Sequence, residues 1–185
     1  LALTAPMPIR NAFTSIVDGS RYQITVDSDE VLYTRLGERI TLEELIELMI
    51  QRSSNLATNL LIDTAEPEKT TALMRSFGAE SIYVRRGVED IKAFDAGLNN
   101  QSSAADMLAV MIACATSERF SDDARQAMLA ILRGQEHTDM IPAGLPEGSG
   151  ALVANKTGEI SRVAHDCAHI LLPDGKQYVL VAFTR

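Results

Sequence analysis

Apolar residues recur at helical spacing through the middle of the chain. From Thr41 onward, leucine, isoleucine and methionine return every three or four positions, which is the period of an amphipathic helix. Thr41 and Glu44 have the spacing of a capping box, in which each side chain satisfies the other residue's free backbone N–H. The stripe stops at Ser53 and resumes at Leu56. We therefore expect two consecutive helices with a break at Ser53.

Three further helices are predicted downstream. One runs from about Pro67, which suits a first turn, to Gly78, which suits a helix stop. Residues 103–117 are strongly apolar, and residues 121–133 are amphipathic. Residues 86–101 show no firm period and are predicted to form a long loop, a feature that is often functional.

The pattern changes after residue 134. A connector rich in proline and glycine leads into segments 151–155, 162–172 and 177–184, which are typical of strands. Pro173-Asp174-Gly175 is a tight-turn sequence, so the last two strands should form a hairpin.

Helices followed by antiparallel strands define an α+β fold. The 185 residues fit one domain, so we expect a single domain over residues 1–185. Its residues 41–140 should be mostly helical, and residues 151–185 should form the sheet. Residues 1–40, which proline and glycine punctuate, should be irregular.

Composition excludes several classes of protein. Hydrophobic residues make up 46% and charged residues 23%, which is typical of a globular protein. The net charge of −8 argues against a nucleic-acid partner, because phosphate binding needs clustered lysine and arginine. No apolar stretch approaches the roughly 20 residues that a transmembrane helix requires. The two cysteines have no metal-ligand spacing and are interpreted as small buried residues.

Ser53-Ser54-Asn55 at the helix break is the first candidate for chemistry. The hydroxyl of Ser53 could relay a proton, and the amide of Asn55 could hold a substrate carbonyl. The alternative is an ordinary helix cap, since serine and asparagine are preferred there. Taken alone, the cap is the more common explanation for such a tripeptide.

Two other segments carry candidate residues. Lys156-Thr157-Gly158, within or just after a strand, offers a positive charge, a hydroxyl donor and room for close approach, although a protective lysine on an edge strand is equally common. Asp95 and Asn99 in the long loop could hold a water and remove its proton. Aspartate and asparagine are also ordinary loop residues.

The order of these three segments resembles class A β-lactamases and related penicillin-binding proteins. The resemblance extends to the surrounding sequences MIQRSSNLATNLLI, IPAGLPEGSGALVANKTG and LLPDGKQYVLVAFTR, and it covers nearly the whole chain from Thr41 onward. It implies the β-lactamase/transpeptidase fold, with the family's N-terminal strands and C-terminal helix outside the printed chain.

The resemblance also implies roles for individual residues. Ser53 would pass a proton to the leaving nitrogen, and Asn55 would hold the substrate's side-chain amide. Asp95 would take the place of the family's deacylating glutamate, with Asn99 helping to hold the water. No metal or organic cofactor is implied.

The strand motif has implied roles of its own. Lys156 would sustain the positive field of the site, and Thr157 would bind the substrate carboxylate. Gly158 would let the substrate lie against the strand, and the backbone N–H of Glu159 would form half of an oxyanion hole.

The sequence departs from the family at three points. Ser54 replaces the usual aspartate of S-D-N, so we expect changed local hydrogen bonding rather than lost chemistry. Asp95 is one methylene shorter than glutamate, which puts fast deacylation in doubt. No lysine follows a serine by three positions, so the nucleophile's S-x-x-K motif is absent. We expect that motif just before Leu1, in a longer protein of which this chain is an interior portion, inactive alone.

Three hypotheses follow. The full-length protein could be a serine β-lactamase, a penicillin-binding D-alanyl-D-alanine peptidase, or a catalytically inert binding domain on the same fold. The substrate would be a small β-lactam or a peptidoglycan peptide, and the family implies a periplasmic or secreted location. His165 and Asp166 are adjacent on a strand and should point to opposite faces, so we interpret both as structural, with Asp166 pairing an arginine.

Overall fold

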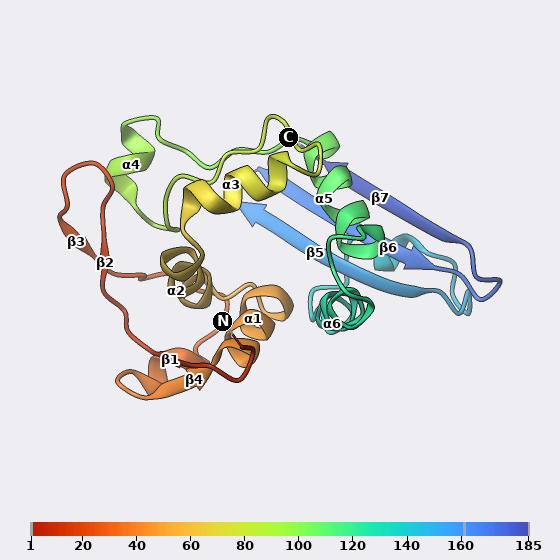
Figure 1. Cartoon of the computed structure of the whole chain (residues 1–185), viewed down its shortest axis with the longest axis horizontal. Coiled ribbons are helices and arrows are strands. Elements are labelled where there is room, and N and C mark those ends of the chain that lie inside the picture. Colours follow the sequence, from red (N-terminus) through yellow and green to blue (C-terminus); the bar gives the residue numbers. More distant parts are fainter. Residues whose placement is uncertain (1, 161, 185) are drawn as a thin grey trace. The chain divides into compact units, whose positions relative to one another are not determined.

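The computed structural model describes residues 2–160 and 162–184. The contacts within the chain define two compact units, and the helices and strands of both are labelled in Figure 1. The first unit comprises Leu1–Leu73 and Tyr83–Gln101, and the second comprises Met74–Ile82 and Ser102–Arg185. The single domain expected over the whole chain stays a prediction.

The helical centre of the first unit follows the sequence pattern closely. Helix α1 spans Leu42–Gln51 and helix α2 spans Asn55–Ala65, with the predicted break between them. The capping box is confirmed, since the backbone N–H of Glu44 donates to the Thr41 hydroxyl at 3.2 Å and the Glu44 carboxylate accepts from the Thr41 N–H at 3.2 Å. Helix α3 follows at Pro67–Arg75.

The first forty residues are more ordered than predicted. Two antiparallel pairs form there: strand β1, Pro6–Pro8, pairs with β4, Arg39–Thr41, and strand β2, Phe13–Thr14, pairs with β3, Arg21–Tyr22. A 3₁₀ helix, η1, covers Val31–Arg35. The prediction of irregular structure was wrong here because strands of two or three residues leave no period in the sequence.

These short elements help to build the core of the first unit. Apolar side chains from the strands and their connections pack with side chains of α1 and α2. The buried residues of this core are Ile9, Phe13, Ile24, Leu32, Ile40, Leu45, Leu56, Ala57 and Leu60. The α1–α2 pair is thereby packed against the N-terminal segment that precedes it in the chain.

The segment 86–101 contains a short helix that the sequence did not predict. Helix α4 spans Ile91–Asp95, and Asp90 caps it by accepting a hydrogen bond from the Ala93 N–H at 3.1 Å. Five residues are too few to show helical periodicity, which explains the error. The remainder of the segment is loop, as expected.

The second unit contains two longer helices. Helix α5 spans Ala104–Thr116 and helix α6 spans Asp122–Arg133, both within a residue of the predicted ranges. Each begins at a serine whose hydroxyl accepts the N–H three residues on, Ser103 for α5 and Ser121 for α6. A 3₁₀ turn, η2, follows at Pro142–Gly144.

Three antiparallel strands form the sheet of the second unit, in the order β5-β6-β7. They span Leu152–Ile160, Val163–Leu171 and Gln177–Phe183. The predicted hairpin between β6 and β7 is confirmed: the Leu172 N–H donates to the Lys176 carbonyl at 2.9 Å, and Gly175 adopts φ 84° in the turn. The α+β fold class is therefore confirmed.

Strand β5 is longer than the predicted 151–155. It continues through Lys156, Thr157 and Gly158, which therefore lie within an edge strand and not after it. The polar sequence of the motif lacks the apolar alternation of a typical strand, and pairing with β6 maintains its extended form, with Thr157 opposite Asp166.

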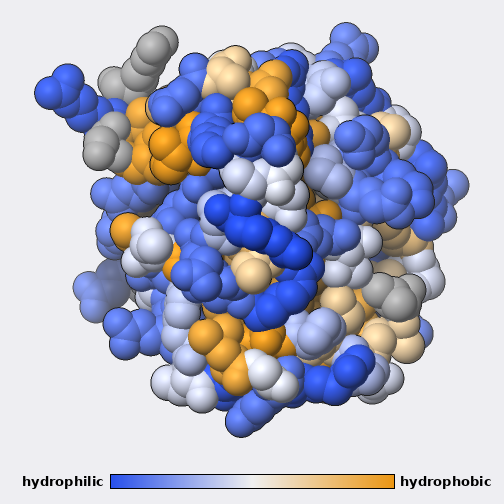
Figure 2. All heavy atoms as spheres, turned by 90° about the vertical axis from the view of Figure 1, so that its left-hand side faces the viewer, coloured by the Kyte–Doolittle hydropathy of each residue, from blue (hydrophilic) through white to orange (hydrophobic). Residues whose placement is uncertain are grey.

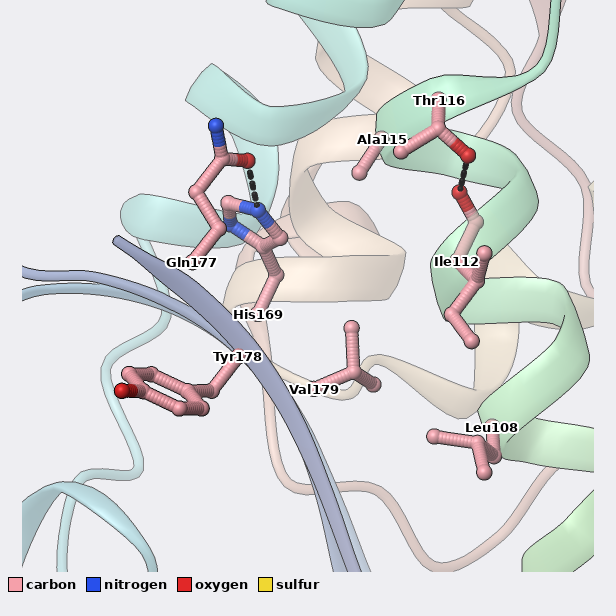
Figure 3. Close-up of a pocket in the computed structure, with 8 residues that line it drawn as sticks. All are labelled: Leu108, Ile112, Ala115, Thr116, His169, Gln177, Tyr178 and Val179. Carbon is pink, nitrogen blue, oxygen red and sulfur yellow. Dashed lines mark hydrogen bonds between the residues drawn. The ribbon is translucent and has the colours of Figure 1, made fainter. Parts of the chain in front are cut away.

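Helix α5 packs on strands β6 and β7, and a small hollow of about 290 Å³ opens between them (Figure 3). Leu108 and Ile112 of α5 face Val179 of β7 across it. His169 is buried at its edge, where its Nε2 lies 2.8 Å from the Gln177 carbonyl oxygen Oε1. His169 is thus a hydrogen-bonded core residue.

The surface shown in Figure 2 is predominantly hydrophilic, and its apolar side chains form separate groups. This agrees with a chain of net charge −8. In the part of the chain that the structure describes, none of the helices has the length and apolar character needed to cross a membrane.

Candidate functional site

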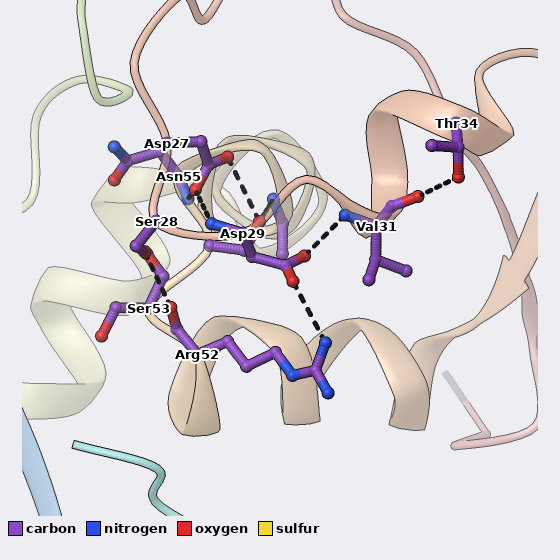
Figure 4. Close-up of polar contacts among 10 residues, drawn as sticks. Asp27, Ser28, Asp29, Val31, Thr34, Arg52, Ser53 and Asn55 are labelled. Atoms are coloured by element: carbon purple, nitrogen blue, oxygen red, sulfur yellow. Dashed lines mark hydrogen bonds and ion pairs between the residues drawn. The ribbon is translucent and has the colours of Figure 1, made fainter.

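The predicted Ser53-Ser54-Asn55 turn lies between α1 and α2, in the first unit. Ser53 has φ 55°, a left-handed conformation that is uncommon for a residue with a side chain. The Ser28 hydroxyl lies within hydrogen-bonding distance of two carbonyl oxygens on this turn, that of Arg52 at 2.7 Å and that of Ser53 at 2.9 Å (Figure 4). Ser54 is fully buried and caps α2 through its hydroxyl, so the capping interpretation is confirmed for this tripeptide, and the functional interpretation stays a prediction.

Val26 and Asp27, which precede η1, hold Asn55 at the end of the turn. The side-chain amide of Asn55 donates to the Val26 carbonyl at 2.9 Å, and the Asn55 backbone N–H donates to the Asp27 carboxylate at 2.7 Å. Among the described residues, the carbonyl oxygen Oδ1 of Asn55 accepts no hydrogen bond. The orientation of this side chain is therefore fixed while one acceptor stays available.

The predicted segment that contains Asp95 and Asn99 forms a loop whose two ends are hydrogen-bonded to each other. Tyr83 and Gln101 exchange two backbone hydrogen bonds of 2.9 Å. The Asn100 side-chain carbonyl accepts the N–H groups of Arg85 and Arg86 at 2.8 and 3.1 Å, and the Arg86 guanidinium donates to Oδ1 of Asn99 at 3.1 Å. Arg86 therefore helps to hold the Asn99 side chain, and the role of Asn99 in holding a water stays a prediction.

Buried Asn59 of α2 anchors this loop. Its Oδ1 accepts the Val88 N–H at 2.6 Å and its Nδ2 donates to the Val88 carbonyl at 3.0 Å. The neighbouring Gly87 leaves no room for a side chain, because a Cβ there would meet the Tyr22 hydroxyl and lie 2.8 Å from Oδ1 of Asn59. The loop is consequently held against α2 at close range.

Glu89 connects the loop to the segment that holds Asn55. Its carboxylate accepts the N–H of Thr25 at 2.8 Å and the N–H of Val26 at 2.9 Å. Val26 therefore contacts Glu89 through its N–H and Asn55 through its carbonyl. Two of the predicted segments, the Ser53–Asn55 turn and the loop, are brought together in this way.

Asp95 differs from Glu89 in its surroundings. It is the last residue of α4 and is exposed, and within the described residues its carboxylate makes no hydrogen bond or ion pair. The carboxylate oxygens of Glu89 and of Asp90, the two other acidic residues of this loop, already accept hydrogen bonds, so Asp95 differs from both, and its role as a base stays a prediction.

The third predicted segment lies on β5, in the second unit. Lys156 is half-buried and donates to the Thr157 carbonyl at 2.6 Å. Burial lowers the pKa of Lys156, and nearby Cys167 and Asp166 oppose that shift. Around Gly158 no atom lies within 4 Å of the position a Cβ would take, and Glu159 is exposed next to it. The edge of β5 thus has open space at the glycine of the motif.

One prediction about β6 was wrong. Asp166 pairs with no arginine among the residues that the structure describes: its carboxylate accepts the side-chain amide of Asn155 at 3.1 Å and the Ile141 N–H at 3.0 Å. His165 instead stacks on Phe183 with ring centroids 4.0 Å apart. The two neighbours have separate partners, which agrees with their structural interpretation.

Asp27 is the residue that sequence reasoning missed. It accepts hydrogen bonds from Asn55, Leu56 and Ser54, although it lies 27 residues before Ser54. The available signal was indirect: position 54 carries a serine in place of an aspartate, and Asp27 belongs to a short acidic run ending at Glu30.

Helices that carry Ser-x-Asn at a break, followed by an antiparallel sheet with Lys-Thr-Gly on its edge strand, define the class of β-lactamases and penicillin-binding proteins. The chain belongs to the β-lactamase enzyme family, whose model matches residues 4–185. No curated protein matches it.

Solved structures agree with this assignment. A β-lactamase from Sphaerobacter thermophilus is 28% identical with a TM-score of 0.80, and the match covers 100% of this chain and 66% of that one. PBP-A is 26% identical with a TM-score of 0.79, over 98% of this chain and 62% of that one. The chain therefore spans a little under two thirds of the length of these two relatives.

Proposed function

We propose that the full-length protein is a serine hydrolase that opens β-lactams through an acyl-enzyme. The observation that carries this proposal is the Ser53–Asn55 turn. Ser28 and Asp27 hold its backbone by hydrogen bonds, and Oδ1 of Asn55 stays available to accept a hydrogen bond from a substrate. A β-lactam carrying an acylamino side chain has an N–H that such an oxygen can accept. Membership of the β-lactamase family supports the same reaction.

In this proposal the first unit supplies proton transfer and substrate orientation. Ser53 passes a proton to the nitrogen that leaves when the lactam ring opens. Asn55 accepts the side-chain N–H of the substrate. A displacement of about 1 Å in such groups can cost on the order of a hundredfold in rate, so their fixed orientation matters.

The second unit would supply the electrostatic part of the site. Lys156 sustains a positive field for the anionic substrate, and Thr157 donates to its carboxylate. The substrate lies along the free edge of β5, where Gly158 leaves room for it, and the N–H of Glu159 is one donor to the developing oxyanion.

Release of the acyl group is assigned to Asp95. Its exposed carboxylate would remove a proton from water, with the NH₂ group of Asn99 helping to hold that water. Because aspartate is one methylene shorter than glutamate, the water would lie farther from its base. Asp95 therefore also supports a second candidate, a penicillin-binding D-alanyl-D-alanine peptidase that acts on peptidoglycan peptides and releases drug slowly.

Similarity to PBP-A favours the same second candidate, since a mutant of that protein was solved as an acyl-enzyme complex with penicillin G. The third candidate is an inert binding domain on the same fold. For either enzyme we propose a periplasmic or secreted location, as is usual in this family.

Labelling of the full-length protein with a fluorescent penicillin, followed by turnover of a chromogenic cephalosporin, separates the three candidates. Steady hydrolysis supports the β-lactamase, and a trapped adduct without turnover supports the peptidase. No label at all supports the inert domain and contradicts the proposal. Mass spectrometry of the labelled peptide would identify the attacking serine.

The role of Asp95 is tested by Asp95→Asn, which should stop turnover while labelling persists. Asp63→Asn is the matched control, because Asp63 is a half-exposed aspartate of the same unit whose partner is Arg10, at 2.7 Å. Equal turnover in the two variants would contradict the assignment of Asp95.

A further inference from the structure

The N-terminus of α2 needs more hydrogen-bond acceptors than its own capping residue provides. The first N–H groups of a helix have no partner within the helix. Ser54, the capping residue, has one side-chain oxygen, which accepts the Ala57 N–H at 3.2 Å. The N–H groups of Asn55 and Leu56 therefore need an acceptor from elsewhere.

Asp27 supplies that acceptor. Its Oδ1 accepts the Asn55 N–H at 2.7 Å, and its Oδ2 accepts the Leu56 N–H at 2.8 Å and the Ser54 hydroxyl at 3.3 Å (Figure 4). A carboxylate at this position is also favoured by the positive end of the helix dipole.

The carboxylate of Asp27 is itself held in place. The Tyr33 hydroxyl donates to Oδ2 of Asp27 at 3.0 Å, and burial together with the Asp27 charge raises the pKa of Tyr33. On the other side, Val26 is fixed by its hydrogen bond to Glu89. A rigid acceptor of this kind can determine where the backbone of Asn55 lies.

We propose that Asp27 is the positioning residue of the Ser53–Asn55 turn, in place of the carboxylate that S-D-N proteins carry at the position of Ser54. The inference rests on the proposed function, because the turn matters for reaction only if it binds substrate. Asp27 fixes the backbone of Asn55, and the hydrogen bond to Val26 fixes its side chain, so Oδ1 is aimed at the acylamino N–H of the substrate.

The change Asp27→Asn tests this role. Asparagine offers one acceptor oxygen, and its NH₂ group would meet one of the two helix N–H groups as a second donor. We expect acylation by penicillin G to fall by roughly ten- to a hundredfold, as for a displacement of about 1 Å. Acylation by the penicillin nucleus without an acylamino side chain should fall much less.

Asp106→Asn is the matched control. Asp106 is a buried aspartate at the N-terminus of α5 that accepts hydrogen bonds from Ser81 and Ser103, so the variant loses the same charge and a similar cap. It should leave the ratio of the two acylation rates unchanged. The exchanged pair Asp27→Ser with Ser54→Asp returns a carboxylate to α2 and should restore most of the ratio.

Amide hydrogen exchange at Asn55 and Leu56 gives a readout that does not depend on reaction. Asp27→Asn should increase exchange there about tenfold or more, and Asp106→Asn should not. If Asp27→Asn does not fold, Tyr33→Phe, which removes one donor to Asp27, should shift the acylation ratio and the exchange in the same direction by a smaller factor.

An unchanged ratio of acylation rates in folded Asp27→Asn or Tyr33→Phe would overturn the inference. If the unaltered protein takes no penicillin label, the proposed function fails. In that case the exchange rates alone still decide whether Asp27 holds the turn, so the two failures are distinguishable.

Discussion

The change Gly87→Ala offers a direct test of how the loop is held against α2. A methyl group at this position would meet the Tyr22 hydroxyl and lie 2.8 Å from Oδ1 and 3.0 Å from Cγ of Asn59. These atoms belong to a packed and hydrogen-bonded group, so they cannot move without cost. Asn59 would have to shift, and its 2.6 Å bond to the Val88 N–H would weaken.

The magnitude follows from two contributions. Overpacking of this kind costs about 1–3 kcal/mol, and loss of a buried hydrogen bond costs about 1–3 kcal/mol. A displacement of Asn59 would relieve the overpacking but weaken the hydrogen bond, so the two costs are not fully additive. We therefore expect the free energy of unfolding to fall by roughly 2–4 kcal/mol. For a chain of this size that corresponds to a Tm lowered by roughly 4–16 °C.

Urea denaturation followed by circular dichroism measures this change. Gly158→Ala is the matched control, because no atom lies within 4 Å of the added methyl group, and its free energy of unfolding should stay within about 0.5 kcal/mol of the parent. Equal unfolding midpoints for Gly87→Ala and Gly158→Ala would refute the reasoning.

Three further predictions concern titration and turnover. Burial lowers the pKa of Lys156 from 10.5. Between the pKa of the folded protein and that of the unfolded chain, the unfolded chain binds more protons, so this residue makes the free energy of unfolding rise with pH. Lys156→Met should remove that rise in urea denaturation measured across this pH range. Burial, then Asp166, raises the pKa of Cys167 to about 11, so mass spectrometry should find it unmodified by iodoacetamide at about pH 8 until the protein is unfolded, and modification of the folded protein would contradict this. In the full-length protein, Asp95→Glu should raise cephalosporin turnover by about ten- to a hundredfold, and an unchanged rate would count against Asp95 as the base.

Local sequence determined the helices and their limits. The spacing of apolar residues fixed α1, α2, α5 and α6, and capping residues such as Thr41 and Ser103 marked where helices begin. These signals lie within a few residues of the structure they specify, because helix hydrogen bonds and caps are local. The hairpin at Pro173-Asp174-Gly175 was predictable for the same reason.

The candidate site was predictable only as a set of residues. The motif order identified Ser53, Asn55, Asp95 and Lys156, and the structure shows what surrounds each of them. The hydrogen-bond partners of each residue come from segments far apart in the chain, which no local pattern specifies.

Tertiary structure alone decided how the site residues are held. Nothing near Asp27 in the sequence indicates that it caps a helix 28 residues downstream, or that Asp166 would choose Asn155 over an arginine. Such partnerships arise when packing brings polar groups together away from water, where each buried donor or acceptor must find whichever partner the fold provides. The sequence thus determined which groups are available, and the packing of remote segments determined which of them meet.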